Sequence, residues 1–479
     1  MADSSSFVAI VLAAGQGTRM KSALPKVLHP MLGRPMVSYP VQAALDAGAE
    51  KVVVVVGHGR EQVQAELARR FDARVISAVQ PEQRGTGDAA LCGAQALPDF
   101  SGWLLVLNGD AAVITAAPLR ALLARAEAAR AELALLTSTL QDASGYGRIL
   151  RDAQGRVTAI RELKDCSADE RSIREFNPGI YAIGAPFFRK AASQLGTSNA
   201  QRELYLTDVV AIAASAGDVA DVPWDAAELE GVNDRAELAA RERDLRLRAC
   251  RSHALAGVTI RDPESTFIDS DVELAPDVAI ESHVHLRGRC RIAAGAHIDV
   301  GCVLSDVSVS ERARLLPYTV ATESTIGPDA QVGPFSHLRP HSQLGPSAHV
   351  GNFVETKNTR VGRGSKANHL SYLGDGVIGE DVNVGAGTIF CNYDGYAKHT
   401  TVLEDGAFIG SDSQLVAPVT VGKDSYVATG TTVTMDVPPG DMAIGRARQV
   451  NKIGLAVRLR ERLKAQADRA KAEKGKATK

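Results

Sequence analysis

The chain has 479 residues, of which 45% are hydrophobic and 23% are charged, a balance that excludes a fibrous or disordered protein and allows more than one core. Its formal net charge is −2, so no overall field draws it to nucleic acid or to a membrane surface, and neither is expected as a partner.

The first residues lack the basic region and the apolar core of a signal peptide, and the most apolar runs are too short to span a bilayer. The six cysteines are scattered without a Cys-x-x-Cys pair, which favours reduced thiols over a disulfide or metal framework. We therefore expect a cytoplasmic protein with no stable membrane association.

Residues 1–232 alternate short apolar runs with amphipathic stretches. Residues 8–12, 51–56 and 103–107 are predicted to be buried strands, and residues 36–47 to be a helix between them. This alternation predicts an α/β domain with a mixed, mostly parallel sheet covered by helices. Ligands of such sheets bind beyond the carboxyl ends of the strands, so the loops there are the first place to look for a site.

A glycine-rich run at residues 12–20 directly follows the first predicted strand. Gly15 and Gly17 let the backbone approach a phosphate chain, and successive N–H groups can form a nest for an anion. The run matches neither G-x-x-x-x-G-K-[ST] nor G-x-G-x-x-G, so a kinase-type loop and a dinucleotide-binding loop are disfavoured. By itself, the run is equally compatible with a purely structural turn.

Neighbouring residues favour phosphate chemistry. Arg19 and Lys26 supply cations shortly after the glycine-rich run. Residues 80–87 offer amide side chains and a second glycine turn, which suit contact with the edge of a base. Asn108 and Asp110 follow the third predicted strand, where phosphoryl transfer needs a carboxylate to hold Mg²⁺.

The composition changes at Asn233, where Arg, Glu, Leu and Ala dominate without proline, and this predicts a helix over residues 233–256 that bridges two domains. From Leu274 aliphatic residues recur every six positions, often with a small residue four positions later, and the same register returns from Ile326 to Val350 and from Leu403 to Val433. A period of six that recurs in this way predicts a parallel β-helix over residues 257–452, with the aliphatic side chain inside and the small one at the corner. Cys290 and Cys302 fall on the small positions and are expected to pack in the core.

The last segment, residues 453–479, is basic and rich in alanine. A solvated, frayed helix or a disordered end is the preferred interpretation, ahead of nucleic-acid binding.

Four strings carry a resemblance to a known family: L-A-A-G-x-G-T-R-M, L-P-K, Q-x-x-x-x-G-T-G and G-D look like the sugar-nucleotide pyrophosphorylases. Together with the hexapeptide repeats, the chain from Val8 to about Lys452 resembles the bacterial bifunctional N-acetylglucosamine-1-phosphate uridyltransferases/glucosamine-1-phosphate acetyltransferases. The resemblance implies a Rossmann-like uridyltransferase domain (1–232), a helical linker (233–256), a left-handed β-helix acetyltransferase domain (257–452) and a basic tail (453–479).

The resemblance also implies the two reactions and their reagents. Acetyl transfer from acetyl-CoA to glucosamine 1-phosphate would precede Mg²⁺-dependent uridylyl transfer from UTP to N-acetylglucosamine 1-phosphate, with release of pyrophosphate. It further implies a homotrimer with acetyltransferase sites between subunits.

For uridylyl transfer, the resemblance implies a set of nucleotide contacts: Leu12, Ala13, Ala14, Gly15, Arg19, Lys26, Gln80, Gly85, Thr86 and Asn108. Gly147, Glu162 and Asn177 would contact the sugar, Asn233 would belong to the same binding set, and Asp110 and Asn233 would hold Mg²⁺.

The chain departs from the family pattern at three places near this set. The family usually has Tyr-Gly-Asp-Val-Pro-Leu where this chain has Asn108-Gly-Asp-Ala-Ala-Val113, and the missing proline is expected to loosen the loop beside Asp110. Asp88 stands where histidine is common, and Pro178 replaces a usual threonine.

The six-residue register breaks between Val350 and Ile409, where polar residues gather, and residues 388–400 look like a loop extruded from the coil. Forming an amide from an amine and a thioester needs a base, for which an imidazole that titrates near neutrality is suited. His369 is the candidate, in the string G-S-K-A-x-H-L-x-Y-L-G-D. Packing or surface roles are preferred for His283, His285 and His297.

For acetyl transfer, the resemblance implies that Arg339 and Lys357 contact the sugar phosphate and that Tyr372 and Asn383 contact the sugar. Glu355 would orient His369 or the substrate. The acetyl-CoA groove would be lined by Ala386, Asn392, Tyr393, Ser411, Thr429 and Arg446, with Thr429 standing where the family often has alanine.

Two other hypotheses remain open at this point. The β-helix could be a purely structural or regulatory module attached to a nucleotidyltransferase, although such a coil would not need the His369 string or the loop with Asn392 and Tyr393. A non-catalytic sugar-nucleotide binder would explain the altered loop after Asn108, but Asp110, Lys26 and Asn233 are all present.

Overall fold

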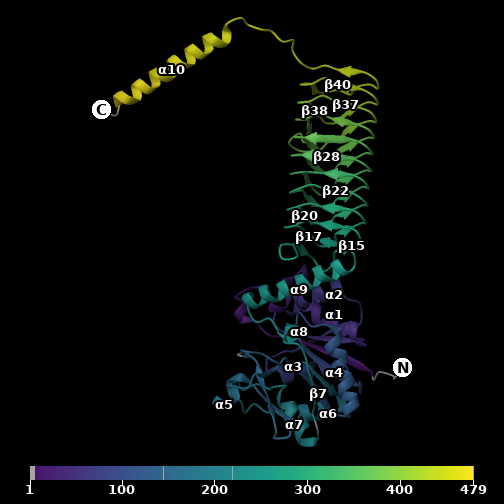
Figure 1. The fold of residues 1–479 in the computed structure, drawn as a ribbon, viewed down its shortest axis with the longest axis vertical. Helices are drawn as coiled ribbons and strands as arrows, with labels where there is room; N and C mark the ends of the chain where they lie inside the picture. The colour runs from purple at the N-terminus through teal and green to yellow at the C-terminus, as the bar shows by residue number, and fades with distance from the viewer. Residues whose placement is uncertain (1–5, 144, 218, 478–479) are drawn as a thin grey trace. The chain divides into compact units, whose positions relative to one another are not determined.

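The structure is a computed structural model that describes residues 6–143, 145–217 and 219–477 (Figure 1). The chain divides after Val309 into two compact units, each of which is described by itself. Among the described residues, none of the helices combines the length and the apolar character needed to cross a membrane.

The first unit begins with a sheet whose strands run in the order β5-β4-β1-β6-β11-β7-β10-β8-β9, with β12 beside β7. The strands β5, β4, β1 and β6 are parallel, whereas β11 is antiparallel to both β6 and β7. The prediction of a mixed sheet with a parallel core is confirmed. The bounds are β1 (Phe7–Ala13), β4 (Val52–Val56), β5 (Val75–Val79), β6 (Trp103–Asn108), β7 (Leu133–Thr139), β8 (Gly147–Arg151), β9 (Val157–Arg161), β10 (Glu175–Asn177), β11 (Tyr181–Gly184) and β12 (Ala220–Pro223).

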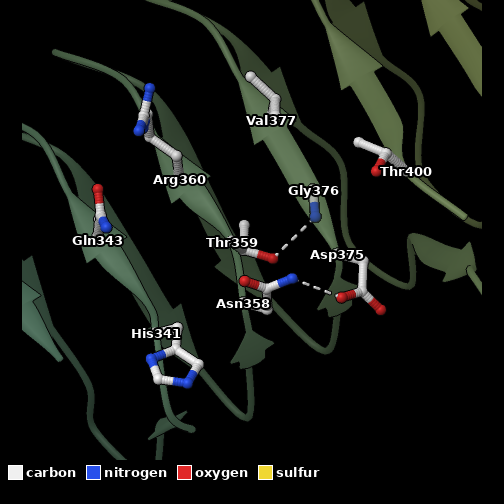
Figure 2. Close-up of a pocket in the computed structure, with 9 residues that line it drawn as sticks. All are labelled: His341, Gln343, Asn358, Thr359, Arg360, Asp375, Gly376, Val377 and Thr400. Carbon is white, nitrogen blue, oxygen red and sulfur yellow. Dashed lines mark hydrogen bonds between the residues drawn. The ribbon is translucent and has the colours of Figure 1, made fainter. Parts of the chain in front are cut away.

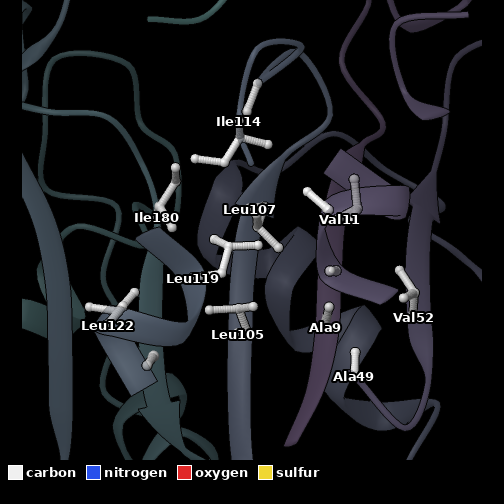
Figure 3. Close-up of a cluster of buried hydrophobic side chains, with 14 of the residues drawn as sticks. Ala9, Val11, Ala49, Val52, Leu105, Leu107, Ile114, Leu119, Leu122 and Ile180 are labelled. Atoms are coloured by element: carbon white, nitrogen blue, oxygen red, sulfur yellow. The ribbon is translucent and has the colours of Figure 1, made fainter. Parts of the chain in front are cut away.

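Alternation along the central strands produces a core on each face of the sheet. Ala9 and Val11 of β1 point to one cluster, which includes Leu119 and Leu122 (Figure 3), whereas Val8 and Ile10 point to the other. One cluster is covered by α1 (Ser38–Ala47), α2 (Arg60–Arg70) and α4 (Ala116–Ala129), and the other by α3 (Thr86–Gln95), α6 (Ala185–Ala192) and α7 (Asp208–Ala216). Shorter elements are β2 (Pro30–Met31), β3 (Arg34–Pro35), α5 (Ala168–Arg171) and α8 (Ala226–Leu229).

The predicted charged helix is present as α9 (Arg235–Leu255). Asp234 caps its start, because its carboxylate accepts the backbone N–H groups of Ala236 and Glu237 at 2.8 and 3.0 Å. Leu238 and Leu245 pack against a small buried cluster that includes Ala112 of the loop after β6. The helix therefore touches the segment that carries Asp110.

The remainder of the first unit is a coil of short parallel strands on three faces. The first face holds β13 (Thr259–Ile260), β16 (Ala279–Ile280) and β19 (His297–Ile298); the second holds β14 (Phe267–Ile268), β17 (His285–Arg287) and β20 (Val303–Ser305); the third holds β15 (Glu273–Leu274), β18 (Arg291–Ile292) and β21 (Ser308–Val309).

The second unit continues the same three-faced pattern, so the predicted parallel β-helix is confirmed. Its first face holds β22 (Arg314–Leu315), β25 (Gln331–Val332), β28 (His349–Asn352), β31 (Lys366–His369), β34 (Asn383–Val384), β37 (Phe408–Ile409), β40 (Tyr426–Val427) and β42 (Met442–Ala443). Its second face holds β23 (Val320–Thr322), β26 (His337–Leu338), β29 (Glu355–Lys357), β32 (Tyr372–Gly374), β35 (Ile389–Cys391), β38 (Gln414–Val416) and β41 (Thr432–Val433). Its third face holds β24 (Thr325–Ile326), β27 (Gln343–Leu344), β30 (Arg360–Val361), β33 (Gly376–Ile378), β36 (Thr401–Leu403) and β39 (Val419–Val421).

The coil stays regular where the sequence register was expected to break. Ala367 pairs with Val350 and with Val384, and Val384 pairs with Ile409, so the inward column is continuous. All four are buried. The coil itself is therefore unbroken, and only the number of residues between inward side chains changes. Shorter coils and a loop inserted between β35 and β36 cause this change.

Two further expectations concern the core and the tail. Cys290 and Cys302 are fully buried, as their place in the repeat predicted. The basic tail forms the helix α10 (Leu455–Ala477), whose side chains are exposed as far as residue 471.

Candidate functional sites

Two pockets meet beyond the carboxyl ends of β1 and β6, and Asn108 and Asp110 line both of them. The first, of about 240 Å³, is lined by Leu12, Ala13, Gly15, Gly17, Thr18, Arg19, Lys26, Val27, Asn108 and Asp110. The second, of about 170 Å³, is lined by Asn108, Asp110, Ala111, Gly145, Tyr146, Gly147, Glu162, Asn177, Pro178, Gly179, Leu229, Gly231 and Asn233. The first therefore gathers residues expected on the nucleotide, and the second gathers those expected on the sugar.

The glycine-rich loop needs glycine at position 17 for two reasons. Gly17 has φ 62°, and a Cβ built there would lie 2.4 Å from the Cβ of Lys26. The loop can therefore fold closely over Lys26 and direct that side chain into the pocket. At Gly15 a Cβ would meet nothing within 4 Å, so this backbone faces open space.

Each oxygen predicted to bind a metal is held by a cation predicted to bind phosphate. Lys26 Nζ lies 2.5 Å from Asp110 Oδ2, and both side chains are largely buried. Arg19 Nη2 donates to Asn233 Oδ1 at 2.7 Å. The structure thus joins these four side chains in two pairs, Lys26 with Asp110 and Arg19 with Asn233, which we call the crossed pairs because each joins an expected phosphate ligand to an expected metal ligand.

The loop after β6 is firmly packed, so the loosening expected from its missing proline is wrong. Ala112 and Val113 are buried, and the carbonyl oxygen of Val113 accepts a hydrogen bond from Arg248 of α9 at 3.0 Å. The carbonyl oxygen of Asp110 accepts the N–H of Val232 at 3.3 Å. These contacts come from residues more than a hundred positions away and replace the constraint that a proline would supply.

The departures at Asn108 and Pro178 lie against each other. Asn108 Nδ2 donates to the carbonyl oxygen of Pro178 at 3.3 Å. A Cβ built at Gly179 would lie 2.3 Å from the same nitrogen, so the Asn108 side chain depends on glycine there. The two altered positions therefore form one local contact at the wall shared by both pockets.

The sugar-side residues are buried and well bonded. Asn177 donates to the Tyr181 hydroxyl at 2.7 Å and accepts the N–H of Gly179 at 3.0 Å. Burial raises the pKa of the Glu162 carboxyl, although a hydrogen bond from the Thr207 hydroxyl acts in the opposite direction. A Cβ built at Gly147 would lie 3.6 Å from Glu162 Oε2, so glycine keeps the approach to this carboxyl open.

Gln80, Gly85 and Thr86 form a turn beside the first pocket but do not line it. Gln80 is buried, and its Nε2 donates to the carbonyl oxygen of Gly85 and to Asp88 Oδ2. Gln83 donates to the carbonyl oxygen of Ala14 at 2.8 Å, which holds the turn against the glycine-rich loop.

In the second unit, three cations gather on the second face of the coil. Arg339 donates to Glu355 Oε1 at 2.8 Å, and Lys357 lies two residues after Glu355 on the same strand, β29. The Lys398 ammonium, with Arg339, lowers the pKa of Lys357. The sequence places Lys398 among the polar residues at the break in the register but indicates no role for it, because it reaches this face only through the inserted loop.

Tyr372 and Asn392 converge over Gly374. A Cβ built there would lie 2.5 Å from the Tyr372 hydroxyl and 2.7 Å from Asn392 Nδ2, so only glycine allows the pair to meet. Asn392 also donates to Asp375 at 2.6 Å. The loop predicted over residues 388–400 is present but starts later, because Ile389–Cys391 form β35, and its side chain Tyr396 is 98% exposed.

His369 ends β31 on the first face and is exposed. Burial, with the charges of Lys366 and His369, lowers the pKa of the neighbouring His349. Among the described residues, Glu355 bonds to Arg339 and makes no hydrogen bond to His369. Asn383 lies on the next strand of the first face, so the predicted residues fall on two faces that flank one corner of the coil.

The residues expected along acetyl-CoA form a row on successive turns. The carbonyl oxygen of Ala386 accepts the N–H of Asp412, and that of Ser411 accepts the N–H of Gly430. Arg446 donates to the carbonyl oxygen of Thr429.

A separate pocket of about 250 Å³ lies at the corner between the second and third faces (Figure 2). Asn358 donates to Asp375 across it at 2.7 Å. None of the predicted site residues is among its lining: His341, Gln343, Asn358, Thr359, Arg360, Asp375, Gly376, Val377 and Thr400.

Comparison with known proteins assigns the chain to a family. Residues 9–176 match the MobA-like NTP transferase domain, and residues 400–435 match the hexapeptide repeat of succinyl-transferase. The bifunctional protein GlmU of Sorangium cellulosum is 57% identical over 461 residues, which cover 95% of this chain and 97% of the relative. Those of Pelobacter propionicus and Trichlorobacter lovleyi are 48% and 49% identical over 95% of this chain and 99% and 98% of their own lengths. The chain therefore belongs to the GlmU family and is a bifunctional transferase, with a nucleotidyltransferase domain and an acyltransferase domain built of left-handed hexapeptide coils, as the sequence resemblance implied.

Proposed function

We propose that the chain makes UDP-N-acetylglucosamine by acetylating glucosamine 1-phosphate in the coil and then uridylylating the product in the amino-terminal domain. The observation that carries the second step is the shared wall of the two pockets beyond β1 and β6. Asp110 and Asn108 line both a pocket that also holds Arg19 and Lys26, which suit phosphates, and a pocket that also holds Glu162 and Asn177, which suit hydroxyl groups. A phosphate oxygen of a sugar in one pocket can thus meet a phosphorus atom of a nucleotide in the other.

Uridylyl transfer needs positioning and charge neutralisation, with no protein nucleophile. The sugar phosphate oxygen attacks the α-phosphorus of UTP in line, and the bond to the leaving pyrophosphate breaks. Lys26 and Arg19 would leave their present partners and neutralise the phosphate oxygens. Asn108 and Pro178, in the wall shared by the two pockets, would keep the two substrates correctly positioned relative to each other.

The donor set fits Mg²⁺. Asp110 supplies a carboxylate oxygen and Asn233 an amide oxygen, which are ligands that this ion accepts, and each already faces a cation. When bound, the ion supplies positive charge to the phosphoryl oxygens.

Acetyl transfer forms an amide bond and breaks a thioester. The amino nitrogen of the sugar attacks the thioester carbon, His369 takes the proton that the nitrogen loses, and the coenzyme A sulfur leaves with a proton. Arg339, Lys357 and Lys398 would bind the sugar phosphate, since three cations close together favour a doubly charged anion.

We further propose that the coil assembles as a homotrimer through one corner. Tyr318, Phe335 and Phe353 stack there with ring centroids 5.2 and 5.5 Å apart, and each side chain is about half exposed. All three have positive φ, a conformation that costs free energy for bulky residues. An exposed aromatic ladder kept at strained positions is typical of a surface that another chain covers.

The same corner separates the two halves of the acetyl-transfer set. His369 and Asn383 lie on the first face, and Arg339 and Tyr372 lie on the second. Copies packed around the corner would set the first face of one chain against the second face of the next. The occupant of this surface is therefore another copy of the chain, and a complete site needs both copies.

An assay of each half-reaction with matched variants tests the proposal. Glucosamine 1-phosphate and acetyl-CoA report the first step, and N-acetylglucosamine 1-phosphate, UTP and Mg²⁺ report the second. We expect His369→Ala to abolish thiol release and spare pyrophosphate release, and Asp110→Ala to do the reverse. If His369→Ala released thiol at the wild-type rate, His369 would not be the base.

The same assay separates the alternative functions. A structural coil attached to a nucleotidyltransferase predicts no thiol release by the intact protein, and a sugar-nucleotide binder predicts no pyrophosphate release. A cytoplasmic location, where UTP and acetyl-CoA are available, fits the proposal.

A further inference from the structure

The amide of Gln80 has only one possible orientation in this structure. Its Nε2 lies 3.1 Å from the carbonyl oxygen of Gly85 and 2.9 Å from Asp88 Oδ2. A carbonyl oxygen and a carboxylate oxygen accept hydrogen bonds and cannot donate them. A rotated amide would place Oε1 against both acceptors, so the nitrogen must face them.

Asp88 is built to keep this orientation. It is buried, in the first turn of α3, where the helix N-terminus stabilises negative charge. Its other oxygen, Oδ1, accepts a hydrogen bond from Arg84 Nη2 at 2.7 Å. Both carboxylate oxygens are therefore engaged, one by Arg84 and the other by Gln80.

The other end of the Gln80 amide, Oε1, is not used by the contacts that hold Nε2. Oε1 has no hydrogen-bond partner in the described part of the chain, although the rest of the side chain is tightly held. The backbone N–H of Gln80 bonds to Val56 at the end of β4, and Gln83 ties the same turn to Ala14. The acceptor thus sits beside the glycine-rich loop, on the side where the proposed function places the base.

We propose that Asp88 is a positioning residue that selects the base: it holds Gln80 so that the amide presents an acceptor, which suits a pyrimidine with an N–H donor at ring position 3. Uracil has that donor, whereas N3 of cytosine is itself an acceptor and would leave two acceptors facing each other. This inference rests on the proposed function, since it assumes that the base lies against this turn.

The test compares UTP with CTP in Asp88→Asn. The asparagine amide can donate as well as accept, so a rotated Gln80 amide then opposes only the Gly85 carbonyl oxygen, and rotation that offers Nε2 to the base costs less free energy. We expect the ratio of kcat/KM for UTP over CTP to fall by about tenfold or more, with CTP gaining relative to UTP. Direct binding of UDP and CDP by calorimetry should show the same change without turnover.

Two matched variants identify the route of the effect. Arg84→Gln removes the other partner of Asp88 and leaves the bond to Gln80, so the ratio should stay at the wild-type value. Gln80→Met removes the amide that contacts the base, so adding Asp88→Asn to Gln80→Met should change the ratio of kcat/KM for UTP over CTP no further. If Asp88→Asn does not fold, as judged by thermal melting and by retained acetyl transfer, Asp88→Ser supplies the same freedom of rotation.

Each result points one way. Equal losses for UTP and CTP in the Asp88 variants overturn the inference, as does a further change of the ratio in the Gln80→Met background. A wild-type protein that releases no pyrophosphate with any nucleoside triphosphate contradicts the proposed function instead, and UDP and CDP binding then still reports on Asp88.

Discussion

Lys26 and Arg19 each bind an oxygen atom, of Asp110 and of Asn233 respectively, that the proposed function assigns to a metal ion. A divalent cation that arrives alone must displace both of them, and a nucleotide that arrives alone must draw them away from oxygens that attract positive charge. When both arrive, the two cations move to the phosphates and leave the oxygens to the metal. We therefore expect the metal ion and UTP to raise each other's affinity by about tenfold or more.

Titration calorimetry of UTP with and without Mg²⁺, and of Mn²⁺ with and without UTP, measures this coupling. Lys26→Gln should sharpen the contrast, because it weakens UTP binding while it frees Asp110 and strengthens the binding of Mn²⁺ alone. Independent binding of the two ligands, or a loss of Mn²⁺ affinity in Lys26→Gln, would show that the crossed pairs do not control the site.

At the scale of elements, the loop after β6 takes its shape from α9. Arg248 donates to the buried carbonyl oxygen of Val113, and Arg248→Met would leave that oxygen without its partner. The long apolar stem of methionine preserves most of the packing. Because Asp110 lies at the other end of this short loop, we expect kcat/KM for uridylyl transfer to fall by about tenfold, with acetyl transfer unchanged.

Arg251→Met, about one turn further along α9, removes the same charge from an exposed side chain and serves as the control. Pyrophosphate release measured for both variants decides the matter: equal rates would mean that burial alone fixes the loop.

Elements whose pattern is local could be predicted from the sequence. The strand expected at residues 103–107 appears as Trp103–Asn108, and the six-residue period yields the three-faced coil, because both signals depend on burial of neighbouring side chains. The helix expected from residue 36 begins at Ser38 instead. Met36 is apolar because it packs in a buried cluster before the helix begins, so its apolar character misplaced the boundary.

Contacts between distant residues could not be predicted in the same way. The glycine-rich loop and Asp110 carry recognisable strings, but the bond from Asn108 to Pro178 and that from Arg248 to Val113 depend on how separate segments meet. The role of Asp88 was hidden for the same reason, since nothing in its spacing from Gln80 indicates which end of the amide it holds. The sequence thus indicates which reactive side chains are present, whereas the tertiary structure determines how these side chains are oriented.

At the scale of the whole molecule, the two sets of site residues belong to different units. All predicted uridyltransferase residues precede Val309, and all predicted acetyltransferase residues follow Ser310. Substitutions in one set should therefore act on the other reaction only through association of the chains. This separation makes uridylyl transfer an internal control for any change of assembly.

Phe335 and Phe353 offer a way to change the assembly without harming the coil. Both stand at corner positions with positive φ, where the coil elsewhere carries Asp329, Asp375 and Asp381. Aspartate tolerates this conformation better than phenylalanine, so the double variant Phe335→Asp and Phe353→Asp should keep its fold. A charged corner repels its counterparts, so we expect light scattering to show monomers in place of trimers, with acetyl transfer reduced at least about tenfold and uridylyl transfer retained.

His341→Asp makes a similar change at another corner, also at positive φ, and should leave the assembly as it is. If the double variant stays trimeric, the aromatic ladder is not the contact between chains. If it dissociates and still acetylates at the wild-type rate, each chain carries a complete site, and His369 and Arg339 must then meet within one coil. Dissociation with selective loss of acetyl transfer would show that the strained aromatic corner holds the trimer together. It would also show that the trimer brings the two halves of the acetyl-transfer site together.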